Sequence, residues 1–227
     1  PTVAVVMNPE GRFGNIRKPI FNAIKLYFGD KKDVKVKYLK GGDELEDQRK
    51  VAQKIVSEKI RFVIGHNSSK IAKQFLLSLP KDYEMTYISP LATSMELLGL
   101  NNGVHIVGPN NKLQIEAIIN SVKAKKLKSP RVAMIVNESE TYSTEMAKFF
   151  EEKIKKELGT ENVHRVSYVK NKFIPDEIVD KAMSYSPDVV FAPIYSYELV
   201  VMYNYYLEKY SSSKPVSYTH LRAHETC

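Results

Sequence analysis

The stretch of residues 62–79, FVIGHNSSKIAKQFLLSL, decides the fold class of this chain. Its first four residues, Phe62–Gly65, are a short apolar run of the kind that forms a buried strand. Polar residues follow from His66, and Ser69–Leu79 has the pattern of a helix. The stretch therefore predicts one strand–loop–helix unit.

The same unit recurs along almost the whole chain. Eight strands are predicted, at Thr2–Met7, Val34–Leu39, Phe62–Gly65, Met85–Ile88, Val104–Val107, Val132–Val136, Val163–Val169 and Asp188–Pro193. Helical patterns lie between and after them, at Ile16–Phe28, Asp43–Glu58, Ser69–Leu79, Ser94–Leu98, Lys112–Ala124, Ser143–Leu158, Pro175–Ser186 and Tyr197–Tyr210. Repeated β-α units of this length favour parallel sheets that carry helices on both faces.

A break divides the series into two. Gly108-Pro109 is a turn signal, and it separates five predicted strands from the three that follow. We therefore expect an α/β protein of two doubly wound parallel-sheet lobes, with residues 1–108 as the first lobe. Residues 109–215 form the second.

The last residues have a different character. Val216–Cys227, VSYTHLRAHETC, shows neither helical nor strand periodicity and is similar to the foreign tails that adapter sequences add to reading frames. We expect it to be foreign or disordered, outside both lobes and without a strand pairing that completes a sheet. The second lobe would then be incomplete, the native protein would continue, and this chain would bind a ligand poorly or not at all.

Composition excludes several classes of protein. Hydrophobic residues make up 43% of the 227 and charged residues 26%, which is ordinary for a globular protein and unlike a disordered chain. The net charge is +8, but the lysines alternate with acidic residues along predicted helices, so no nucleic-acid partner is expected. The single cysteine, Cys227, allows no internal disulfide, and no metal or cofactor is expected.

Polar loops follow the predicted strands at the edge where open parallel sheets bind their ligands. His66–Lys70 and Ser89–Ser94 carry hydroxyl groups directly before helical turns, where the positive helix end favours an anion. Two such loops on neighbouring strands could hold one carboxylate. The alternative is that these serines and threonines only cap the helices.

The sequence shows no sign of an enzyme. No phosphate-binding loop, dinucleotide fingerprint, metalloprotease or nucleophile-elbow motif occurs in the required context. His66 lacks a nucleophile partner, and Glu138 and Glu140, which could form an acid–base pair, lie in a loop where carboxylates are usually solvated.

Three stretches carry a resemblance to a known family. FVIGHNSS (62–69), ISPLATSMELL (88–98) and RVAMIVNESETY (131–142), together with the opening Val3–Ala23, resemble branched-chain amino-acid-binding proteins of bacterial ABC importers. These have the type I periplasmic binding fold. The resemblance runs in order from Thr2 to Pro215, and its most specific element is Ile88-Ser89-Pro90 followed by Ala92-Thr93.

The resemblance implies a ligand site between two lobes that close by a hinge. It places Ser69 and Thr93 on the ligand α-carboxylate and Leu91 at a position of backbone contacts. It places Tyr142 and Tyr195 on the ligand side of the second lobe and Phe13 in the side-chain pocket. Lys70 and Ile71 depart from the family pattern, and the family residue that binds the ligand ammonium would lie beyond Pro215.

The resemblance further implies an extracytoplasmic solute-binding protein for an amino acid or similar small polar ligand. Its partner would be the membrane permease of an ABC importer, and its place would be the periplasm or cell exterior, with a lipid anchor as one form of attachment. The alternative is a sensor or regulatory lobe that acts through a protein partner. A helix-turn-helix ahead of Thr2 would instead indicate a transcription regulator of similar fold.

Overall fold

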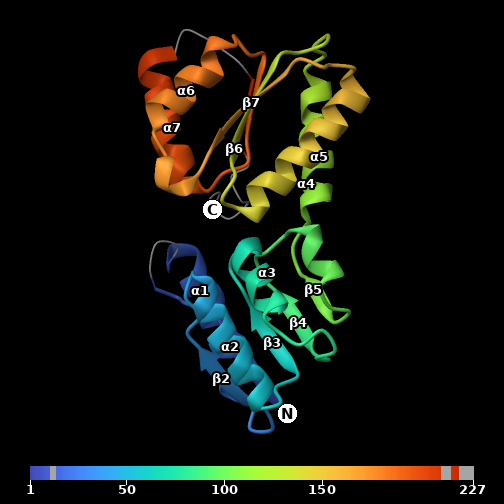
Figure 1. Cartoon of the computed structure of the whole chain (residues 1–227), viewed down its shortest axis with the longest axis vertical. Coiled ribbons are helices and arrows are strands. Elements are labelled where there is room, and N and C mark those ends of the chain that lie inside the picture. The colour runs from blue at the N-terminus through green and yellow to red at the C-terminus, as the bar shows by residue number, and fades with distance from the viewer. Residues whose placement is uncertain (11–13, 211–215, 220–227) are drawn as a thin grey trace. The chain divides into compact units, whose positions relative to one another are not determined.

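A computed structural model describes residues 1–10, 14–210 and 216–219 of the chain. The chain divides into two compact units, Pro1–Asn110 and Asn111–Cys227 (Figure 1). The division falls two residues after the boundary expected at Gly108, because the next helix, α4 (Asn111–Ala124), begins only at Asn111. Each unit is an α/β domain built on one parallel sheet.

The first unit has the five-stranded parallel sheet that the sequence predicts, in the order β2-β1-β3-β4-β5. Its elements are β1 (Thr2–Val6), α1 (Gly14–Gly29), β2 (Lys35–Leu39), α2 (Leu45–Ser57), β3 (Phe62–Gly65), α3 (Ser69–Leu77), β4 (Thr86–Ser89), the 3₁₀ helix η1 (Met95–Gly99) and β5 (Val104–Ile106). Alternate residues of β1, Ala4 and Val6, join Ile55 of α2 and Phe75 of α3 in one buried cluster. This cluster fixes α2 and α3 on one face of the sheet.

The second unit has a four-stranded parallel sheet in the order β7-β6-β8-β9. After α4 its elements are β6 (Val132–Asn137), α5 (Thr141–Leu158), β7 (Val163–Tyr168), the 3₁₀ helix η2 (Lys170–Lys172), α6 (Pro175–Ser184), β8 (Val189–Ala192), α7 (Ser196–Tyr210) and β9 (Val216–Thr219). Each predicted helix and strand begins and ends within two residues of the observed one.

Strand β6 is buried on both faces, as a central parallel strand should be. Val132, Met134 and Val136 pack with α4 and α5, whereas Ala133 and Ile135 pack with α6 and α7. The two helix pairs lie on opposite sides of this sheet (Figure 1). The alternation along one strand therefore produces the doubly wound arrangement.

The expectation that the tail makes no strand pairing is wrong over four residues. Val216–Thr219 forms β9 and pairs in parallel with β8, from Val189 opposite Val216 to Ala192 opposite Thr219. The pairing has a physical reason, because the outer edge of β8 would otherwise present unpaired N–H and C=O groups. Three of the four residues, Val216, Tyr218 and Thr219, are also of types that favour strands.

Both sheets reverse their strand order at one place. In each unit the first strand along the chain lies between the second and the third. The connection that follows the first strand therefore runs in one direction across the sheet, and the connections after it run in the other. The reversal lies between β1 and β3 in the first sheet and between β6 and β8 in the second. In open α/β sheets, ligands bind beyond the carboxyl ends of the strands at this switch point. The fold therefore identifies one such position in each unit.

Candidate ligand-binding site

The first unit brings Ser69 and Thr93 together. Ser69 is fully buried at the start of α3, and its Oγ accepts hydrogen bonds from the backbone N–H groups of Thr93 and Ser94, each at 3.3 Å. Leu91, in the same loop as Thr93, is also buried. The Ser69 hydroxyl thus joins the loop after β4 to the helix after β3, at the carboxyl edge of the sheet.

Neighbouring hydroxyls serve as caps and turns. Ser68 Oγ accepts from the N–H of Ile71 at 3.3 Å and caps α3, and Ser94 Oγ accepts from the N–H of Glu96 at 3.2 Å and caps η1. The capping alternative therefore holds for Ser68 and Ser94. Ser69 differs from both, because its hydroxyl acts between two loops rather than within one.

His66 is a buried aromatic residue of the same edge. Its ring lies 4.7 Å from that of Phe75 and 5.9 Å from that of Tyr87, between centroids. The backbone N–H of His66 donates to Tyr87 Oη at 2.7 Å, and His66 Nδ1 lies 3.0 Å from the same oxygen. Burial lowers the pKa of His66 to about 3, so the ring is neutral near pH 7.

The second unit brings Tyr142 and Tyr195 together. Their rings stack with centroids 6.1 Å apart, and Tyr195 Oη donates to Glu140 Oε2 at 3.3 Å. Tyr142 is only 2% exposed and packs in the cluster beneath α4 and α5, whereas Tyr195 is half-buried. Of the two, Tyr195 is the one whose ring is accessible at the edge of its unit.

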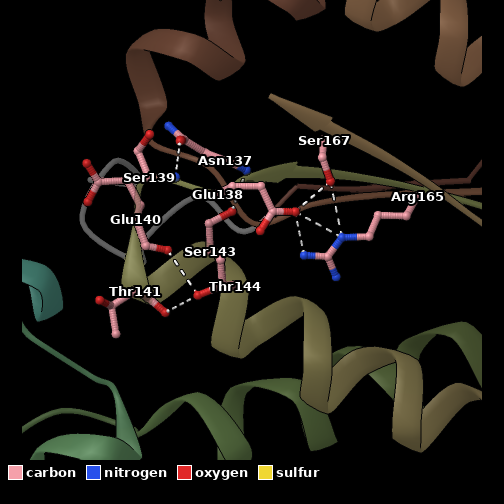
Figure 2. A network of polar contacts seen from close by, with 9 residues as sticks. All are labelled: Asn137, Glu138, Ser139, Glu140, Thr141, Ser143, Thr144, Arg165 and Ser167. Atoms are coloured by element: carbon pink, nitrogen blue, oxygen red, sulfur yellow. Dashed lines mark hydrogen bonds and ion pairs between the residues drawn. The ribbon is translucent and has the colours of Figure 1, made fainter. Parts of the chain in front are cut away.

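The loop after β6 keeps Glu138 and Glu140 apart. Figure 2 shows Glu138 directed toward Arg165 and Ser167 of β7, while Glu140 points the other way. Glu138 Oε1 accepts from Arg165 Nη2 at 2.7 Å and from Ser167 Oγ at 2.6 Å. Burial raises the pKa of Glu138, but the hydrogen bonds from Ser167 and Arg165 outweigh it and hold that pKa below its ordinary value. The two carboxylates therefore do not form an acid–base pair.

Two polar residues of this edge were not anticipated from the sequence. Asn137, the last residue of β6, donates from Nδ2 to Glu198 Oε1 at 3.1 Å, and its backbone N–H donates to Ser143 Oγ at 2.9 Å. Both Asn137 and Glu198 are buried. A polar residue at the end of an otherwise apolar strand was the available signal for Asn137, whereas Glu198 stands in a helical pattern that gives none.

Phe13 lies outside the described residues. Within the described part of the chain there is no group of three or more histidine, cysteine, aspartate or glutamate side chains that could hold a metal ion. The described helices also include none long and apolar enough to cross a membrane.

Proteins similar to this chain were found by comparison with solved structures. No family model matches the chain, and a search of curated proteins found no match. Solved structures match with high scores. A leucine-binding protein from Thermotoga maritima aligns with a TM-score of 0.76 and 19% identity, over 89% of this chain and 58% of its own.

Two further structures extend the range of ligands. A solute-binding protein of an ABC transporter from Rhodopseudomonas palustris, in complex with 4-hydroxybenzoic acid, aligns with a TM-score of 0.81 and 14% identity, over 96% of this chain and 61% of its own. A leucine-, isoleucine-, valine-, threonine- and alanine-binding protein from Brucella ovis aligns with a TM-score of 0.77 and 16% identity, over 96% and 59%. This chain thus spans about 60% of the length of these proteins.

The class follows from these observations. The chain has two doubly wound parallel sheets, each with polar, hydroxyl-bearing loops at its carboxyl edge, and it has the type I periplasmic binding fold. The resemblance noted in the sequence is confirmed for the fold. The solved structures that share this fold include some described as solute-binding proteins of ABC transporters.

Proposed function

We propose that this chain is the ligand-binding part of an extracytoplasmic solute-binding protein, which binds a small carboxylate-bearing ligand and delivers it to the permease of an ABC importer. The observation that carries the proposal is the contact between Ser69 and the backbone of Thr93 and Ser94, at the carboxyl edge of the first sheet. It holds two hydroxyl-bearing loops in one place, where the fold favours a ligand. The type I fold supports the same function.

Each residue of the proposed site that the structure describes is given one role. The Thr93 hydroxyl binds the ligand carboxylate, and Ser69 positions that loop from its buried place. Leu91 supplies an apolar wall, and Tyr195, stacked on Tyr142, contacts the ligand from the second unit. Phe13 is proposed as a further wall on the sequence resemblance. The protein is not an enzyme under this proposal, since no chemistry is needed beyond binding and release.

Amino acids and aromatic acids are the ligand classes to test, because solved proteins of this fold bind both. Leucine, isoleucine, threonine, valine and 4-hydroxybenzoate are titrated into the chain up to millimolar concentration, and the melting temperature is followed. A ligand that binds only the folded state adds about 2.7 kcal/mol at a hundredfold excess over its Kd. A rise in melting temperature with one class supports the proposal.

The control is Thr93→Val, which removes a hydroxyl at nearly constant volume. It should remove most of the ligand-induced rise in melting temperature. A panel without any rise, together with recovery of a stable complex with a protein partner, would contradict transport and favour the sensor alternative.

A further inference from the structure

A small pocket lies beside the Ser69 loop, at the switch point between β1 and β3. It is lined by Asn8 after β1, Gly41 and Asp43 after β2, His66 and Asn67 after β3, and Arg17 of α1. All of these belong to the first unit. The pocket lies at the edge and between the strands where a sheet of this order binds its ligands.

The ring nitrogen Nε2 of His66, in the pocket wall, lacks a hydrogen-bond partner in the described part of the chain. His66 is 97% buried, and its Nε2 has no hydrogen-bond partner among the described residues. His66 and Gly41 both line the pocket, and a Cβ added at Gly41 would lie 4.0 Å from His66 Cδ2, the carbon bonded to Nε2. A buried ring nitrogen without a partner costs about 1–3 kcal/mol, so a group that fills this position would be favoured.

The hydrogen bonds of Tyr87 bear on whether His66 Nε2 is a hydrogen-bond donor or an acceptor. Tyr87 Oη accepts from the backbone N–H of His66, and burial raises the pKa of this phenol, so it keeps its proton. His66 Nδ1, at 3.0 Å, and the Ser89 side chain are both hydrogen-bond partners of Tyr87 Oη and can accept that proton. When Nδ1 accepts, the single proton of the neutral imidazole is on Nε2, which is then a donor directed into the pocket.

We propose that His66 Nε2–H donates a hydrogen bond to an oxygen atom of the ligand in this pocket, so that the ligand carries an oxygen group in addition to the carboxylate near Thr93. This inference rests on the proposed function and narrows its ligand class. Hydroxylated acids fit the requirement, and purely aliphatic amino acids such as leucine do not. Arg17 offers only donors at the same wall; it is 5% exposed, and its Nη2 lies 3.6 Å from Asp43 Oδ1, which offsets part of its charge.

The test uses pairs of ligands that differ by one hydroxyl group: 4-hydroxybenzoate against benzoate, and threonine against valine. Affinity for the whole chain is measured by titration calorimetry. A single hydrogen bond predicts that the hydroxylated member of the pair that binds is favoured by about 3- to 10-fold. Isotope-labelled histidine spectra of the free protein report independently whether the proton of His66 is on Nε2.

Two variants of His66 separate its two ring nitrogens. His66→Asn retains a polar group near the position of Nδ1 and lacks one at Nε2, and it should abolish the preference for the hydroxylated ligand. His66→Gln reaches the position of Nε2 and should keep part of the preference. Circular dichroism confirms that both variants are folded.

Failure of this inference can be told apart from failure of the proposed function. Equal affinities within the pair, or a proton on Nδ1 in place of Nε2, overturn the role of His66 while binding itself still supports a solute-binding protein. Absence of binding by all four compounds overturns both.

Discussion

At the scale of the residue, His66 links the stability of the first unit to pH. Its pKa is about 3 in the folded chain and 6.5 ordinarily. Below pH 6.5 the unfolded chain gains a proton that the folded chain does not, so stability falls by up to about 1.4 kcal/mol for each pH unit until pH 3 is approached. Above pH 7 the ring is neutral in both states and has no such effect.

We therefore expect the free energy of unfolding to fall by about 2 kcal/mol more between pH 7 and pH 5 in the native sequence than in His66→Gln, which cannot titrate. Urea unfolding at the two pH values measures both. The same fall in the two proteins would show that His66 is protonated in the folded state.

Gly65 lies where the neighbouring backbone leaves no room for a side chain. Its φ is +155°, and an added Cβ would lie 2.4 Å from the backbone oxygen of Val6. Gly65→Ala must push β3 away from β1 and should lower the free energy of unfolding by about 1–3 kcal/mol. Gly99→Ala is the matched control, because nothing lies within 4 Å of its added Cβ. Equal melting temperatures for the two variants would contradict the close approach of the strands.

At the scale of the element, the Ser69 hydroxyl joins the N-terminus of α3 to the loop after β4. Ser69→Ala leaves the N–H groups of Thr93 and Ser94 without their acceptor, and should lower the free energy of unfolding by about 1–3 kcal/mol. Ser121→Ala removes an exposed hydroxyl that bonds only to Ala117 O within α4, and should change it by less than about 0.5 kcal/mol. Thermal and urea unfolding measure both, and a cost for Ser69→Ala no larger than for Ser121→Ala would show that the two loops are held in another way.

The elements that the sequence predicted well are those with a local signal. The apolar run of β6 and the helical pattern of α5 each contain the information for their own structure, because burial follows from periodicity. Val216–Thr219 was missed because four residues carry too little pattern, and its pairing depends on an edge that β8 provides only in the folded unit.

The candidate site was predictable only where its residues follow from the positions of the strands. That Ser69 and Thr93 lie together followed from the common edge of parallel strands. That the Ser69 hydroxyl accepts backbone N–H groups, that Tyr142 packs inward, and that Glu198 is buried against Asn137 depend on tertiary contacts between distant segments. A single sequence contains no periodic trace of such contacts.

At the scale of the whole molecule, the two units repeat one design. Each has a parallel sheet whose first strand lies between the second and third, and each carries its polar loops at the carboxyl edge. Under the proposed function, the ligand contacts the carboxyl edge of the first sheet at Thr93 and Ser94.

Backbone amide spectra of the labelled chain during titration with the best ligand of the panel test that claim most directly. Saturable shifts are expected at Thr93 and Ser94. No shift is expected at Asn101–Gly103, on the opposite edge of the first sheet. Shifts confined to that opposite edge would contradict the proposed contact.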